Sequence, residues 1–124
     1  MTPTQTMYRR EIMELYSEKP NFGILKNHDY EIKLKNPGCN DEIIIQIKIN
    51  KKTNKITDAK FSGTTCFIST ISSSAILKNI KGMTIEQVKK LKKEDIDKFL
   101  GINIIPTRIK CELLPLEAIK KIKC

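Results

Sequence analysis

Two alternating apolar runs on either side of a Pro-Gly turn constrain the fold of this chain more than any other feature. In "YEIKLKN", residues 30–36, apolar and polar side chains alternate, and in "EIIIQIKIN", residues 42–50, isoleucine occupies every second position. Successive side chains of a strand point to opposite faces, so each run predicts a strand with one buried face. A polar "KKTN" loop leads to a third such run, "KITDAKFSG" at residues 55–63. Strands joined by such short turns predict a three-stranded antiparallel sheet.

The rest of the chain has helical periodicity, with apolar residues three or four positions apart. A first helix is expected before the sheet and is stopped by Pro20, and several helices are expected after it. Thr84 and Gln87 have the spacing of a capping box, and Pro115 is expected in the first turn of the last helix, where proline is tolerated. The predicted helices cover residues 7–20, 66–82, 84–91, 93–101 and 111–124. We therefore predict an α+β fold, a three-stranded antiparallel sheet with helices packed over one face.

Length and composition predict one soluble domain over residues 1–124. No apolar run approaches the roughly 20 residues of a membrane span, and "MTPTQTMYRRE" lacks the apolar core of a signal peptide, so we expect a cytoplasmic protein without a membrane partner. The net charge is +9, but 20 of the 23 basic residues are dispersed lysines. We therefore expect a solvated lysine-rich surface and no nucleic-acid partner, with a basic nucleic-acid-binding module as the remote alternative.

Three cysteines and one aspartate stand where they can serve as ligands. Cys39 and Asp41 share the turn before the second strand, while Cys66 and Cys111 begin predicted helices. The positive end of a helix dipole favours thiolate over thiol, and nearby Arg108 and Lys110 are expected to lower the pKa of Cys111 further. Three thiols and one carboxylate form a plausible tetrahedral shell for zinc or iron. The spacing alone leaves open both a metal site and three unrelated cysteines.

Four motifs in chain order resemble those of the iron–sulfur cluster scaffold family, which includes IscU, the N-terminal domain of NifU and the SufU-like proteins. "MYRREIMELYSEKPNFG" is similar to the opening helix of that family, and "GCNDEI" to its Cys-Gly-Asp motif. "FSGTTCFISTISSSAI" resembles the segment that leads from strand to helix with a cysteine and a serine cluster, and "IPTRIKCELLPLEAIKK" resembles the last motif. The resemblance covers nearly the whole chain.

The resemblance implies a scaffold that is not itself an enzyme. Such a scaffold accepts persulfide sulfur from a cysteine desulfurase, binds iron and assembles a transient [2Fe-2S] cluster for transfer to apo iron–sulfur acceptor proteins. Carried over by motif, Cys39, Cys66 and Cys111 are the ligands, and Asp41 is the labile fourth ligand. Zinc is the alternative occupant of the same site. The sulfur acceptor is Cys111 if the chain is IscU-like and Cys39 if it is SufU-like.

The chain departs from the family pattern at several positions. Lys110 replaces the histidine that precedes the last cysteine of IscU, as in SufU-like proteins, yet the insertion of those proteins is absent. The alternative is therefore a SufU-like, zinc-dependent sulfur-transfer protein that activates a desulfurase without building a cluster. "IIPTR" replaces the chaperone motif, so we do not expect recognition by the dedicated Hsp70-type chaperone. We expect a monomer or weak dimer, a solvated loop position for His28 and no function for Cys124.

Overall fold

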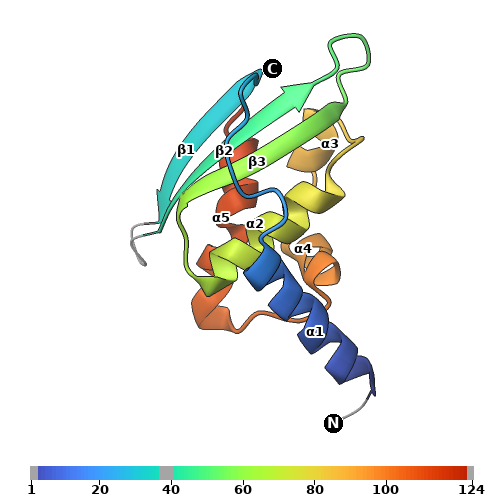
Figure 1. The fold of residues 1–124 in the computed structure, drawn as a ribbon, viewed down its shortest axis with the longest axis vertical. Helices are drawn as coiled ribbons and strands as arrows, with labels where there is room; N and C mark the ends of the chain where they lie inside the picture. Colours follow the sequence, from blue (N-terminus) through green and yellow to red (C-terminus); the bar gives the residue numbers. More distant parts are fainter. Residues whose placement is uncertain (1–2, 37–40, 123–124) are drawn as a thin grey trace.

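The computed structural model describes residues 3–36 and 41–122, so Cys39, Asn40 and Cys124 lie outside the described residues. One helix precedes three strands, and the remaining helices follow them, in the predicted order (Figure 1). The elements are α1 (Pro3–Glu18), β1 (Tyr30–Asn36), β2 (Asp41–Ile49), β3 (Ile56–Thr64), α2 (Phe67–Asn79), α3 (Ile85–Lys89), α4 (Lys93–Leu100), the 3₁₀ turn η1 (Pro106–Arg108) and α5 (Ile109–Lys120).

The three strands form one antiparallel sheet in the order β1-β2-β3. At its centre Ile45 pairs with Ile32 of β1 and with Phe61 of β3. The isoleucines at 43, 45 and 47 are fully buried, whereas Lys48 is exposed, so the alternation in the sequence marks the buried face as predicted. The α+β prediction, with a three-stranded antiparallel sheet, is confirmed.

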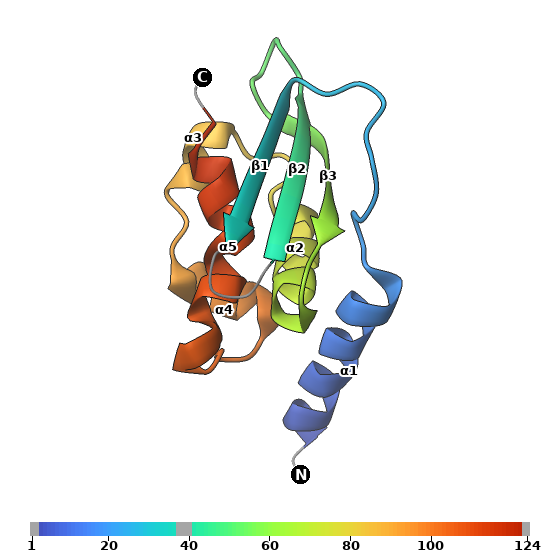
Figure 2. The same cartoon turned by 90° about the vertical axis from the view of Figure 1, so that its left-hand side faces the viewer.

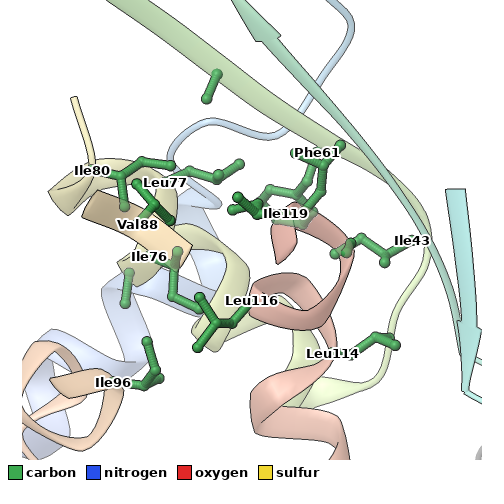
Figure 3. Packing of buried hydrophobic residues seen from close by; sticks show 14 of the residues in the cluster. Ile43, Phe61, Ile76, Leu77, Ile80, Val88, Ile96, Leu114, Leu116 and Ile119 are labelled. Carbon is green, nitrogen blue, oxygen red and sulfur yellow. The ribbon is translucent and has the colours of Figure 1, made fainter. Parts of the chain in front are cut away.

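The helices cover one face of the sheet (Figure 2). α5 packs against β1 and β2, and α2 packs against β3 and α5; α1 and α4 lie against α2, and α3 lies against α5. Figure 3 shows Ile43 and Phe61 of the sheet facing the helical layer, where Leu116 and Ile119 belong to α5. This shared apolar core sets the starts of β2, α2 and α5 at one end of the molecule (Figures 1 and 2). None of the described helices is long and apolar enough to span a membrane.

Local sequence signals explain several helix ends. Thr84 and Gln87 form the predicted capping box at the start of α3, and Gly101 ends α4 with a left-handed backbone at φ 73°. One helix boundary needs correction. α1 begins at Pro3, four residues earlier than predicted, because proline is well suited to a first turn. Tyr16 near the end of α1 lies beside Phe67, with 4.8 Å between ring centroids, and is 40% exposed.

The position of Pro115 was also predicted wrongly. α5 starts at Ile109, so Pro115 is the seventh residue of the helix and lies inside it, beyond the first turn. Proline has no N–H and therefore cannot donate to the carbonyl four residues before it, which here belongs to Cys111. The hydroxyl of Ser69 in α2 lies within hydrogen-bond distance of that carbonyl, at 3.1 Å. A polar side chain from another helix thus stands where the helical pattern alone leaves the carbonyl without its usual N–H donor.

Candidate metal centre

Asp41, Cys66 and Cys111 come together at one end of the molecule. One potential ligand atom from each residue lies within 4.8 Å of the other two. Asp41 is the first residue of β2, Cys66 immediately precedes α2, and Cys111 is in the first turn of α5. Three segments distant in the sequence therefore supply two thiols and a carboxylate to one small volume.

Asp41 is held by two donors that belong to the same helix end. Its side chain is buried, and it pairs with Asn36 where the ladder between β1 and β2 ends. Oδ1 accepts from the backbone N–H of Cys66 at 3.1 Å, and Oδ2 accepts from the hydroxyl of Ser69 at 2.8 Å. Two hydrogen bonds from a rigid helix end limit the movement of a carboxylate. Both oxygens are therefore aimed at the start of α2.

Cys66 takes the N-cap position of α2, where serine, threonine, aspartate and asparagine are usual. Its sulfur accepts from the N–H of Ser69 at 3.4 Å and so satisfies one of the N–H groups left free at a helix start. The sulfur also accepts from Nη2 of Arg108 at 3.1 Å. Cys66 is half-buried, so its thiol is both stabilised by donors and partly open to solvent.

Cys111 differs from Cys66 in having no exposed surface. The side-chain amide of Asn36, at the end of β1, donates to its sulfur at 3.7 Å. Asn36 is itself buried at the point where β1 ends, so the amide is held close to the sulfur by the strand. The more deeply buried of the two described thiols therefore has a polar partner from the sheet.

Arg108 contacts a different cysteine from the one expected from its position in the sequence. Its guanidinium donates to Cys66, 42 residues away in the chain, and not chiefly to nearby Cys111. The pKa of Arg108 is raised, first by this hydrogen bond and then by its electrostatic interactions with Cys66 and Cys111. Arg108 thus supplies positive charge to both sulfurs, while Lys110 is exposed.

The remaining predicted residues have mixed outcomes. Cys39 lies outside the described residues, so its roles as ligand and sulfur acceptor stay predictions, as does the absence of a function for Cys124. His28 is exposed in a loop, as expected. Sequence reasoning missed Ser69 and Asn36. A serine three positions after a helix-capping residue could have drawn attention to Ser69, but no local signal marks Asn36.

A pair of carboxyl side chains, one fully buried and one half-buried, lies next to the site. Glu112, which follows Cys111, has no exposed surface, and Lys93 Nζ is 3.9 Å from its Oε1. Burial, then the hydrogen bond with Asp97 and its charge, raise the pKa of Glu112 to about 8, against the opposing effect of Lys93. Burial also acts to raise the pKa of Asp97, but its hydrogen bonds with Glu112 and Lys93 outweigh it and lower that pKa. The pair therefore shares one proton, carried by Glu112.

Known proteins resemble this chain over nearly its whole length. The chain is 32% identical to iron sulfur cluster assembly protein 1, mitochondrial, of Debaryomyces hansenii over 95% of this chain, but it spans only 66% of that protein. It is also 32% identical to the zinc-dependent sulfurtransferase SufU of Bacillus subtilis, over 94% of this chain and 88% of that protein. These relatives come from mitochondria and from bacteria, so the cytoplasmic location stays a prediction.

Solved structures agree with the sequence matches. A putative iron–sulfur cluster assembly scaffold protein for the SUF system from Fervidobacterium islandicum AW-1 superimposes with a TM-score of 0.71 and 25% identity, over 94% of this chain and 96% of that one. The family model described as the NifU-like N terminal domain matches residues 7–122. The chain therefore belongs to the NifU-like N-terminal domain family of iron–sulfur cluster assembly scaffold proteins, to which IscU, NifU and SufU also belong.

Proposed function

We propose that this chain is an assembly scaffold, and not an enzyme, that accepts persulfide sulfur from a cysteine desulfurase and binds iron. On it a transient [2Fe-2S] cluster is built and then passed to apo-proteins. The observation that carries this proposal is the convergence of the carboxylate of Asp41 and the sulfurs of Cys66 and Cys111 within 4.8 Å. Cys39 is proposed as the further ligand. Four such ligands match the tetrahedral sites of iron and zinc.

The donor set suits a cluster that must leave. Thiolates are soft ligands that bind iron and zinc well, whereas a carboxylate is a harder and weaker partner for such ions. The N–H of Cys66 and the hydroxyl of Ser69 donate to this carboxylate and orient it, but they do not make it a softer ligand. Asp41 is therefore the ligand that we expect to be displaced first when the cargo is transferred.

Sulfur transfer needs an accessible thiolate. The acceptor thiolate attacks the outer sulfur of the persulfide, the S–S bond breaks, and its electron pair leaves with the cysteine of the desulfurase. Cys111 is fully buried, so its use as acceptor requires the first turn of α5 to move. Cys39 is the other candidate. The protein is treated with a desulfurase and cysteine, and the added sulfur is detected by mass spectrometry. The acceptor is the cysteine whose replacement, in Cys39→Ser or in Cys111→Ser, abolishes the added mass.

The alternative is a zinc-dependent sulfur-transfer protein that stimulates a desulfurase and builds no cluster. The similarity to the Bacillus subtilis zinc-dependent sulfurtransferase favours it. Both candidates use the same residues. They differ in what the site holds during turnover, an iron–sulfur cluster in one case and zinc in the other.

Anaerobic reconstitution separates the two functions. The protein is incubated with iron, cysteine and a desulfurase while visible absorption and bound zinc are followed together. Growth of a [2Fe-2S] spectrum with loss of zinc supports the scaffold. Retained zinc, no chromophore and a faster desulfurase support the sulfur-transfer protein, and neither cluster nor zinc would refute both.

Substitution of the ligands tests the site itself. Cys39→Ser, Cys66→Ser and Cys111→Ser should each abolish stable cluster assembly, with Cys124→Ser as the matched control that retains it. Asp41→Ala should give a longer-lived cluster, because it removes the displaceable ligand. A normal yield in one cysteine variant would remove that residue from the ligand set, and an unchanged or shorter cluster lifetime in Asp41→Ala would contradict the role of the carboxylate.

A further inference from the structure

We infer that Ser69 is a positioning residue that holds the Asp41 carboxylate in the metal centre and allows it to be released. The inference rests on the proposed function for its purpose, but the contacts stand on their own. Ser69 has no exposed surface. Its hydroxyl lies 2.8 Å from Oδ2 of Asp41, and its N–H donates to the sulfur of Cys66 at 3.4 Å. One residue therefore contacts two members of the ligand set.

The third member is contacted through its backbone. The hydroxyl oxygen of Ser69 is 3.1 Å from the carbonyl oxygen of Cys111. The same hydroxyl oxygen is 3.5 Å from the sulfur of Cys66. The usual helical donor to that carbonyl would be residue 115, which is proline and has no N–H. Ser69 therefore joins the starts of β2, α2 and α5 at the point where their ligand side chains meet.

A single hydroxyl proton has two acceptors within reach. The carboxylate of Asp41 is the nearer and the stronger acceptor, so we assign the hydroxyl proton to it in this state. The carbonyl of Cys111 is the second acceptor, at 3.1 Å. When Asp41 moves, the hydroxyl can turn to that carbonyl, so no buried donor is left without a partner. This second acceptor lowers the free-energy cost of releasing the carboxylate.

Other serines of α2 do not share this arrangement. Ser72, one turn further along, is equally buried, but its hydroxyl donates to the carbonyl of Glu112. No hydrogen bond joins Ser72 to Asp41, Cys66 or Cys111 among the contacts recorded for the described residues. Ser72→Ala is therefore a matched control, since it also removes a buried serine hydroxyl that bridges α2 and α5.

The test measures the affinity of the purified, metal-free protein for Co²⁺, whose d–d absorption reports tetrahedral coordination, with Zn²⁺ competition as a second readout. Ser69→Ala should weaken binding about tenfold, as is typical for loss of a residue that orients a ligand. Ser72→Ala should bind as the wild type does. If Ser69 acts through the carboxylate, Ser69→Ala should have no further effect in an Asp41→Ala background. Wild-type affinity in Ser69→Ala, or the same loss in both backgrounds, would overturn the inference.

A second variant covers the case in which Ser69→Ala does not fold. Ser69→Thr keeps the hydroxyl, so its Co²⁺ affinity should stay close to that of the wild type, whereas a tenfold loss would overturn the role of the hydroxyl. The experiment is separable from the proposed function. Suppose that Ser69→Ala weakens Co²⁺ binding only when Asp41 is present, and that cluster reconstitution fails. This result would refute the scaffold function and leave the role of Ser69 intact.

Discussion

Replacement of Glu112 by glutamine should make the protein more stable at alkaline pH and should leave its stability at acidic pH nearly unchanged. Glu112 is a fully buried carboxyl that shares a proton with Asp97. Glutamine has the same shape, stays neutral at every pH and can still donate a hydrogen bond to Asp97. The variant therefore removes the titration of this side chain while it keeps the packing.

The magnitude follows from the two pKa values. Glu112 releases its proton at about pH 8 in the folded protein, against an ordinary value of 4.5. Between these values the folded state binds one proton more than the unfolded state, so the free energy of unfolding falls as pH rises, and it falls no further above pH 8. At about 1.4 kcal/mol per pH unit the ceiling is about 5 kcal/mol. Solvent screens the charges of the partly exposed Lys93 and its partners. We therefore expect the substitution to raise the free energy of unfolding at alkaline pH by about 2 kcal/mol.

The assay is urea unfolding at a series of pH values between 5 and 9, with chelator and reductant present so that metal binding does not contribute. A gain of about 2 kcal/mol corresponds to a shift of about 1 M in the urea midpoint of Glu112→Gln relative to the wild type. The gain should grow from pH 5 to pH 8 and then level off. Glu117→Gln, at an exposed position of the same helix, is the matched control and should show no such growth. A stability difference between wild type and Glu112→Gln that is the same at pH 5 and pH 8.5 would refute the reasoning.

Three further predictions concern the fold. Gly63→Ala should destabilise the protein by about 1–3 kcal/mol, because φ is 109° and an added Cβ would overlap the carbonyl oxygen of Glu42; a wild-type melting temperature would contradict this. Ile45→Ala, in the centre of the sheet with no exposed surface, should cost about 2–5 kcal/mol in urea unfolding, whereas the exposed Lys48→Ala should cost little. Thr84→Ala removes the capping box of α3 and should cost about 1 kcal/mol, and a loss below the error of a thermal melt would argue against the cap.

Much of the fold could be predicted because its signals are local. Alternating isoleucines define which face of β2 is buried, and the spacing of Thr84 and Gln87 defines where α3 begins. The positions of Cys66 and Cys111 near helix starts also followed from periodicity. These features depend on residues a few positions apart, where strand and helix geometry leaves few choices.

The neighbours of each ligand could not be predicted in the same way. Arg108 was assigned to the nearest cysteine in the sequence, but its guanidinium reaches Cys66 because η1 and the start of α2 lie side by side. The amide of Asn36 reaches the sulfur of Cys111, 75 residues away in the chain. Such pairs arise from packing between elements, and no sequence spacing encodes them.

Taken by itself, the sequence determined the order of the elements, the buried face of the sheet and the residue types offered as ligands, because these depend on local periodicity and on side-chain chemistry. Only the tertiary structure decided that Asp41, Cys66 and Cys111 lie within 4.8 Å of one another. It also decided that Ser69 bridges them and that Glu112 is buried beside Asp97. The physical reason is that packing of α2 and α5 on one sheet face brings together groups whose distance along the chain carries no information about their distance in space.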